Sequence, residues 1–415
     1  CISSAASDVY KRQREDNKLY HETYNGVQLM KGHQFPDGVD PYKIKGDSTS
    51  GLLWGISPAA LSPDGTGDKL VQAYNYRICL TDNPANKIEI TRPENYDSTK
   101  YELLLRLFDA QPDKRKLNHY FIWSRMPNNK TDINNRGGFS TDMIGMNHNY
   151  PEASYEERAE IIQAHKDYTQ GLLYFYKTAP RVPQELRDEI QALGYPKDEY
   201  TENNHWSPQL YIRESRRMTG DYVMTQAHCE GRETVADGIG MAAYTMDSHN
   251  CQRILVKKDG KYIVKNEGNV EIGGGLPYPI SYRSIIPKEE ECKNLLVPVC
   301  LSASHIAYGS IRMEPVFMVL AQSAAIAATE AINTGSVQTV DIKKVQALLH
   351  ENPLLDGSSS EILIDDCDLD ISANNDWEII KKRGGYGPTF LKSKARNGSP
   401  CLLYTSDAAD DMQCV

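Results

Sequence analysis

The sequence lacks close cysteine pairs, a basic stripe and a long apolar run, and each absence excludes a class of protein. None of its nine cysteines stands in a CxxC pair, the spacing that zinc and iron–sulfur sites usually require, so no metal site is expected. The formal net charge is −10, and no cluster of Lys and Arg interrupts it, which argues against a nucleic-acid partner. No apolar run approaches the ~20 residues that a membrane helix needs, so no membrane span is expected.

The two ends of the chain read like translated library-adapter DNA. Residues 3–13 read SSAASDVYKRQ and residues 401–411 read CLLYTSDAADD, and one DNA string and its reverse complement encode the two peptides. We therefore expect residues 1–13 and 401–415 to be adapter-derived and exclude them from fold reasoning; the alternative is a pair of ordinary polar tails. On this interpretation the chain is a fragment of a longer protein.

Apolar spacing and capping residues predict the helices and strands. An amphipathic helix is expected at 154–178 with Ser154 as its N-cap, and an Ala-rich helix from Pro315 to about Ile332, ended by Gly335. Asp259-Gly260 is typical of a hairpin turn, and residues 125–151 are expected to form a polar, Asn-rich loop. Further helices are expected at 101–110, 182–194 and 341–350, and strands at 69–81, 277–287 and 294–304.

Six cysteines lie between the two ends. Cys79 and Cys300 sit inside apolar, strand-like runs, so free buried thiols are favoured, while one or two disulfides stay open. The six are Cys79, Cys229, Cys251, Cys292, Cys300 and Cys367.

The stretch LSASHIAYGSIRMEPVFMVLAQSAAIAA, residues 301–328, predicts an anion site. A strand enters a loop of Ser, His and Gly, and Pro315 then opens a helix whose N-terminus offers free N–H groups and the positive end of its dipole. The alternative is an ordinary buried helix after a strand. The expected ligand-binding residues are Ser302, Ser304, Gly309, Ser310, Arg312, Met313 and Glu314, with His305 facing the reacting side.

A second group of candidate residues is the sequence DSHN, residues 247–250, which is polar within an apolar segment. His249 beside Asp247 can act as a general base, and the alternative is a structural histidine. Arg213, Arg216 and Arg217 would share one helix face and clamp a carboxylate or phosphate, unless they only form salt bridges. In the Asn-rich loop, substrate contacts are expected from Lys130, Asp132, Asn134 and Asn135, the alternative being a solvated loop.

Several long stretches together resemble the bacterial FAD-dependent oxidoreductase family, which is distantly similar to heterodisulfide-reductase A-like flavoproteins. They include NNKTDINNRGGFSTDMIGMN, LYIRESRRMTGDYVMTQ, YTMDSHN and NLLVPVCLSASHIAYGSIRMEPVFMVLAQSAA, and the resemblance covers about residues 22–335. It implies an FAD/NAD(P)-binding fold and makes FAD the ligand of the 302–314 segment.

The chain also departs from that family's pattern. No GxGxxG turn follows a strand, although that turn normally cradles the FAD pyrophosphate, so the missing half of the FAD site is expected upstream. Relatives often carry Gly-Asp where Ser304-His305 stands, and the iron–sulfur cysteines of heterodisulfide reductases are not matched. From Glu361 onward, IDDCD, DW and GGYGP resemble a golvesin C-terminal-like domain of xanthan-lyase-type proteins, which hints at a polysaccharide or surface context.

The expected fold class is α/β: a truncated Rossmann-like FAD/NAD(P)-binding fold with an inserted α+β substrate domain, followed by the start of a β-sandwich. Residues 14–290 form the substrate domain, 291–350 the C-terminal part of the FAD-binding domain, 351–360 a linker and 361–400 a truncated golvesin-like domain.

The expected function is hydride transfer from a small polar or saccharide-like substrate to FAD, by an enzyme that is inactive as this fragment. The alternative is a non-catalytic carbohydrate-binding or cell-surface protein. A cell-envelope or secreted location is favoured, and the oligomeric state is not indicated.

Overall fold

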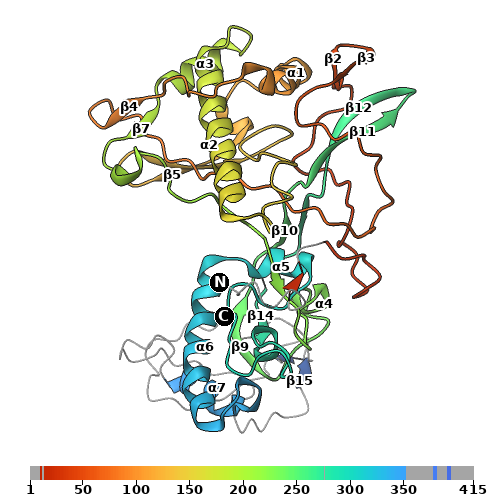
Figure 1. Ribbon diagram of the computed structural model, residues 1–415, viewed down its shortest axis with the longest axis vertical. Coiled ribbons are helices and arrows are strands. Elements are labelled where there is room, and N and C mark those ends of the chain that lie inside the picture. Colours follow the sequence, from red (N-terminus) through yellow and green to blue (C-terminus); the bar gives the residue numbers. More distant parts are fainter. Residues whose placement is uncertain (1–9, 12–13, 275, 352–376, 381–389, 394–415) are drawn as a thin grey trace.

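The computed structural model describes residues 10–11, 14–274, 276–351, 377–380 and 390–393. These form two lobes, with α1 to α3 in one and α5 to α7 in the other (Figure 1). Each lobe has its own hydrophobic core: one cluster runs from Phe35 to Val264 in sequence, and the other from Met224 to Val345. Because these ranges overlap, the chain passes between the lobes more than once, and β10 (Met246–Ser248) lies where they meet.

The helices of the first lobe follow the predicted capping and periodicity. Helix α2 spans Tyr155–Thr178, and Ser154 caps it as predicted. The Ser154 hydroxyl accepts from the N–H of Glu157, and the Glu157 carboxylate accepts from the N–H of Ser154. Helix α1 spans Glu102–Ala110, close to the prediction. Helix α3, Gln184–Gln191, ends earlier than predicted because Gly194 begins strand β7 (Gly194–Pro196), which pairs with β4 (Lys87–Glu89).

The Asn-rich loop prediction was wrong in its first part. Strands β5 (Phe121–Met126) and β6 (Lys130–Asn135) form a hairpin there. Three residues, 127–129, connect the strands, since Met126 pairs with Lys130. Asn128 and Asn129 have φ of 61° and 56°, so the last two of the three are left-handed. The strands predicted at 69–81 and 294–304 are represented only by isolated bridges, such as Ile78 to Ile133 and Ala303 to Met224.

In the second lobe, β9 (Gly238–Ala242) pairs with β14 (Tyr278–Ser281), and β10 pairs with β13 (Val270–Ile272). The hairpin of β11 (Gln252–Lys258) and β12 (Lys261–Glu267) turns at Asp259-Gly260, as predicted, and reaches into the first lobe. The predicted loop before Pro315 is wrong in part, since it contains helix α5 (His305–Ile311). The last helices are α6 (Glu314–Thr334), ended by left-handed Gly335 as predicted, and α7 (Ile342–Glu351).

The arginine segment forms no helix, which corrects the prediction of a shared helix face. Residues 213–216 lie outside helices and strands, and Arg217 begins β8 (Arg217–Met218), which pairs with β1 (Tyr10–Lys11). Those two β1 residues fall inside the stretch expected to be adapter-derived. The remaining short elements are β2 (Tyr42–Ile44), β3 (Asp47–Leu52), α4 (Gln226–Cys229) and five 3-10 turns, Ser98–Tyr101, Leu117–His119, Thr201–Asn203, Tyr282–Ile285 and Val337–Thr339.

All sheets among the described residues are two-stranded. The fold is therefore a mixture of helices and small sheets, and neither an inserted domain nor a β-sandwich follows from it. In the tail, β15 (Trp377–Ile380) pairs with β16 (Phe390–Ser393). The rest of the golvesin-like prediction, most of the linker and Cys367 lie outside the described residues. The five described cysteines between the ends are free thiols, as favoured, but only Cys229 and Cys251 are buried, and Cys79, Cys292 and Cys300 are half-buried.

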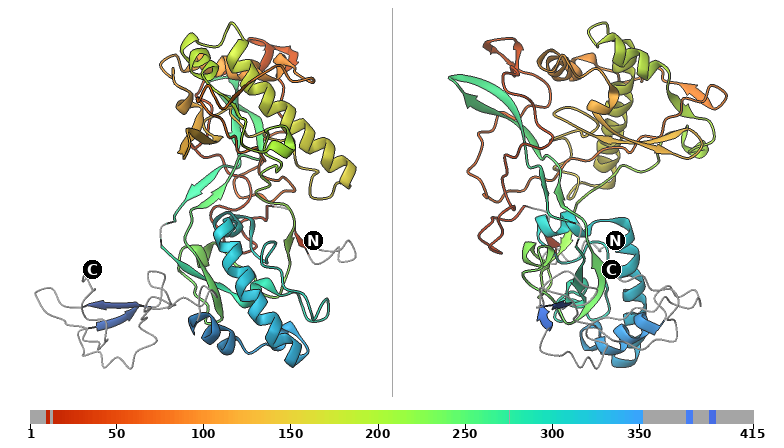
Figure 2. Two further views of the ribbon diagram at one scale, coloured as in Figure 1. Left: turned by 90° about the vertical axis from the view of Figure 1, so that its left-hand side faces the viewer. Right: turned by 180° about the vertical axis from the view of Figure 1, so that it is seen from behind.

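Helix α6 corrects the expectation that no apolar segment is long enough to span a membrane. Its 21 residues are long and apolar enough to cross a membrane by length and composition, and most of the helix surface is not buried. Met318 and Ile332 are 72% and 82% exposed, and the helix lies along the outside of its lobe (Figure 2). Core helices of soluble proteins share this length and composition.

Candidate active site

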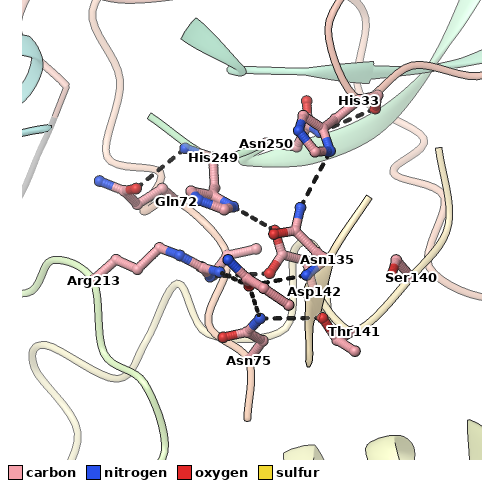
Figure 3. A network of polar contacts seen from close by, with 12 residues as sticks. His33, Gln72, Asn75, Asn135, Ser140, Thr141, Asp142, Arg213, His249 and Asn250 are labelled. Atoms are coloured by element: carbon pink, nitrogen blue, oxygen red, sulfur yellow. Dashed lines mark hydrogen bonds and ion pairs between the residues drawn. The ribbon is translucent and has the colours of Figure 1, made fainter. Parts of the chain in front are cut away.

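The centre of the site is His249, which follows strand β10 directly. Its Nδ1 lies 2.7 Å from Oδ2 of Asp142 (Figure 3). Burial by itself raises the pKa of Asp142, but the charges of Arg213 and His249 outweigh burial and lower it, so the carboxylate is ionised and accepts. The Nδ1 of His249 therefore carries the hydrogen, and its Nε2 is left as the basic atom.

Arg213 holds Asp142 from the other side. Its guanidinium forms an ion pair of 3.0 Å with Oδ1 of Asp142, and neither side chain is more than 3% exposed. The same guanidinium donates 2.5 Å to the carbonyl of Ala73 and 3.4 Å to Oδ1 of Asn134. A carboxylate held in this way cannot rotate freely, so it fixes the orientation of the His249 ring.

A second ion pair lies beside Nε2 of His249. Oδ2 of Asp247 is 3.6 Å from that nitrogen and accepts a 3.0 Å bond from Arg312. Burial raises the pKa of Asp247, yet His249 and Arg312 lower it well below its usual range. Arg312, Asp247, His249, Asp142 and Arg213 thus form one continuous row in which an Arg–Asp ion pair lies on each side of the His249 ring, called here the charge row.

His33 approaches the charge row from a different part of the chain. Its ring centroid lies 6.4 Å from that of His249, and its Nδ1 accepts from the N–H of Gly137 at 3.2 Å. Burial, followed by the charge of His249, lowers the pKa of His33. His33 is therefore neutral, with its hydrogen on Nε2, 3.9 Å from the exposed carboxylate of Glu271.

A buried network lies behind the site. Gln72 accepts from the backbone N–H of His249 at 3.1 Å and donates to Glu214 at 2.8 Å. Glu214 in turn lies 2.7 Å from Nδ1 of His305, whose Nε2 is 3.0 Å from the hydroxyl of Ser248. His305 is only 2% exposed, so its contacts are with the interior.

The structure brings together four of the residues singled out by sequence: Asp247, His249, Arg213 and Arg312. Asn134 and Asn135 flank them at the end of β6. Arg217 is fully buried and pairs with Glu15 and Glu214 at 2.9 and 2.8 Å, so the structure gives it protein partners.

Lys130 and Asp132 lie at the other end of β6, in a separate cleft of about 320 Å³. Lys130 contacts Asp198 at 2.9 Å and also Glu199, while Asp132 pairs with Arg77. Tyr200, 38% exposed, lines the same cleft.

The serines and the glycine of the 302–310 segment are engaged inside the protein. Ser302 accepts from the N–H of Gly220 at 3.1 Å, and Ser304 donates to Glu22 at 2.6 Å. Ser310 donates to the carbonyl of Tyr244 at 2.6 Å. At Gly309 a Cβ would lie 2.7 Å from the carbonyl oxygen of Asp247, so glycine lets α5 pack against β10.

The end of this segment lies nearer the surface. Met313 is the N-cap of α6 and is half-buried, and Glu314 is exposed. The ligand-binding roles assigned from sequence to Ser302, Ser304, Gly309 and Ser310 stay predictions, as do those of Met313 and Glu314.

Sequence reasoning missed Asp142, His33 and Gln72. Asp142 stood inside the Asn-rich stretch, and a carboxylate directly before apolar Met143 and Ile144 was the available signal. His33 and Gln72 carried no comparable signal, because each is recruited by contacts with segments far away in sequence. Among the described residues, no group of three or more His, Cys, Asp or Glu side chains could hold a metal ion.

Comparison with protein-family models matches residues 5–349 to the family described as FAD dependent oxidoreductase. The matched range contains every residue of the charge row and the whole of α6. Searches of curated proteins and of solved structures gave no match.

Proposed function

Because the chain belongs to the FAD dependent oxidoreductase family, we propose that it oxidises a hydroxyl group of a polar substrate, with His249 as the base. FAD is its cofactor. When bound, FAD would accept a hydride, which is two electrons and one proton, from the substrate. The substrate carbon loses that hydride and its hydroxyl loses a proton, so the C–O bond becomes a C=O bond. The proton goes to Nε2 of His249.

The observation that carries this role is the 2.7 Å bond from His249 Nδ1 to Asp142. It assigns the hydrogen to Nδ1 and leaves the lone pair of Nε2 for a proton from the substrate. Asp142 then stabilises the imidazolium that forms, as a buried carboxylate does in other Asp–His pairs. The His249 side chain keeps 10% of its surface exposed, so a substrate can reach it.

The residues before α6 fit the flavin end of FAD. No side chain caps this helix, and its first-turn N–H groups have no acceptor within the helix. In the described part of the chain, the buried Nε of Arg312 also has no hydrogen-bond partner. The backbone N–H of Glu314, at this helix N-terminus, would hold the end of the flavin that becomes negative, as helix N-termini do for anions. The N–H of Met313 is already bonded to the carbonyl of Ile311, and the Arg312 guanidinium is paired with Asp247.

A non-catalytic carbohydrate-binding or cell-surface protein was the alternative from sequence, and the comparisons give it no support. Inactivity of this chain by itself, a cell-envelope or secreted location and the golvesin-like tail stay predictions.

The test is His249→Asn in the protein reconstituted with FAD. Anaerobic reduction of the flavin by hydroxyl compounds is followed by the loss of its visible absorbance. We expect the rate to fall about 10²–10⁴-fold, the usual contribution of a positioned base, with little change in the melting temperature.

His165→Gln is the matched control. His165 is a buried histidine of α2 whose Nδ1 lies 2.7 Å from the carbonyl of Ile161, and burial lowers its pKa to about 4. Its replacement should change stability and leave the rate of flavin reduction intact. If His249→Asn lowers the melting temperature while the rate is unchanged, His249 is structural and the proposal fails.

A further inference from the structure

We propose that the substrate of this site is a neutral polyhydroxylated compound, a sugar or polyol, whose hydroxyl groups bind amide oxygens around His33. The inference rests on the proposed function, because it names the class of hydroxyl compound that His249 deprotonates. Two observations carry it: the buried charges of the site cancel, and the hydrogen-bonding capacity left around His33 consists of acceptors.

The charges cancel within the charge row. Arg213 pairs with Asp142 at 3.0 Å, Arg312 pairs with Asp247 at 3.0 Å, and no side chain of the four is more than 15% exposed. A phosphate, carboxylate or ammonium group would therefore find no free counter-charge within the charge row. To bind, it would have to break a buried ion pair, which leaves the abandoned partner uncompensated at a large cost.

The free capacity lies in three asparagines around His33. Asn250 and Asn266 donate through Nδ2 to the carbonyl of His33 at 3.3 and 2.9 Å, and Nδ2 of Asn135 contacts its Nδ1 at 3.4 Å. Within the described residues, Oδ1 of each of these three amides is buried and has no hydrogen-bond partner. Buried amide oxygens almost always have a donor, so a molecule that donates hydrogen bonds belongs there.

The backbone of His33 supports a functional reason for this arrangement. Its φ is 45°, a left-handed conformation that is uncommon for residues other than glycine and concentrates at functional sites. The bonds from Asn250 and Asn266 to its carbonyl hold it there. The two amides thus have fixed positions, with their nitrogens committed to His33.

Hydroxyl groups match these requirements better than other ligand groups. Each hydroxyl both donates and accepts, without charge, so one can donate to an amide oxygen while a neighbour loses its proton to His249. An anion brings no donor for the amide oxygens, and an ammonium group brings an uncompensated charge. His33 and His249 keep 16% and 10% of their side chains exposed, which gives the ligand a way in.

The experiment is calorimetric titration of the full 415-residue chain, loaded with FAD. Neutral probes are methyl α-D-glucopyranoside, methyl β-D-galactopyranoside and myo-inositol, and charged probes are glucuronate and glucose 6-phosphate. We expect at least one neutral probe to bind, and to bind at least tenfold more tightly than either charged probe. Asn135→Leu, which removes one acceptor, should weaken that binding about 5- to 10-fold, the usual effect of one hydrogen bond.

Asn95→Leu is the matched control, because it makes the same replacement at an asparagine whose Nδ2 donates to Asp167 of α2 at 2.9 Å. It should leave binding unchanged. If Asn135→Leu fails to fold, Asn250→Leu removes an acceptor from the same group and takes its place.

Three outcomes overturn the inference. The first is tighter binding of a charged probe. The second is no binding of any neutral probe, which would mean that the amide oxygens carry water only. The third is loss of binding in Asn95→Leu but not in the variants of Asn135 or Asn250. The proposed function fails on a different result. A sugar that binds but never reduces FAD refutes the proposed oxidation, while the inference that the site binds sugars or polyols still holds. If a simple alcohol reduces FAD in a protein that binds no sugar, the proposed oxidation is supported and the inference of a sugar or polyol substrate is refuted.

Discussion

Asp142→Asn should separate the catalytic role of the charge row from its structural role. The change is nearly isosteric but removes the negative charge between His249 and Arg213. Arg213 has no exposed side-chain surface, so it would be left buried without its counter-charge, which typically costs about 3–5 kcal/mol of unfolding free energy. His249 would also lose the acceptor that fixes its Nδ1–H form, and flavin reduction should slow by about 10²–10⁴-fold.

The double variant Asp142→Asn with Arg213→Met distinguishes the two effects. Removing both members of a buried ion pair is often close to neutral for stability, so urea unfolding should return toward the wild-type midpoint. The rate should stay low, because no carboxylate orients His249. Nitrogen NMR of labelled histidine should show His249 hydrogen on Nδ1 in the wild type and a mixture in both variants. An unfolding free energy within about 1 kcal/mol of wild type for the single variant, or a rate restored in the double variant, would refute this reasoning.

Three further predictions concern the residues around the charge row. Arg312→Met should lower the reduction potential of bound FAD, measured by spectroelectrochemistry, and Arg312→Lys should recover part of it because it keeps the charge but not the fork geometry; an unchanged potential with lower thermal stability would make Arg312 only a brace. Glu214 should contribute about 3 kcal/mol of stability above pH 4.5 that is lost as the pH falls toward 2, since burial raises its pKa but His305 and Arg217 lower it from 4.5 to about 2; in Glu214→Gln this part of the acid unfolding profile should be absent, and an identical profile would contradict it. Gly309→Ala should lower the melting temperature, because its Cβ would lie 2.7 Å from the Asp247 carbonyl oxygen; wild-type stability would show that α5 can shift freely.

Local features of the fold could be predicted because their causes act over a few residues. Ser154 and Glu157 cap α2 three residues apart, Gly335 ends α6 in a left-handed conformation, and Asp259-Gly260 closes the β11–β12 turn. The wrong secondary-structure predictions also concern short segments, but there the outcome depends on whether another segment pairs with them. The pattern at 69–81 is strand-like, yet it forms isolated bridges, since no neighbouring segment runs beside it for long enough to build a ladder.

The arginines show why the candidate site could be predicted only in part. The sequence predicted that they clamp an anionic ligand and left salt bridges as the alternative. The structure shows ion pairs for Arg213 and Arg217, whereas the helix predicted for them was wrong. Arg213 pairs with Asp142 and Arg312 with Asp247, so two groups that sequence reasoning assigned to anionic ligands are neutralised inside the protein. Which charge remains free is a property of packing.

The sequence by itself determined the family, the cofactor, and several caps and turns, and it singled out His249 and Asp247 as candidates. Residue type, short-range spacing and long motifs carry that information. Only the tertiary structure decided that Asp142, 107 positions away from His249, is the carboxylate that orients it, and that His33 joins the site. Contacts between such distant segments form only when the cores of both lobes pack. Once a polar group is buried, its energy depends on the hydrogen-bond or charge partner that packing places beside it.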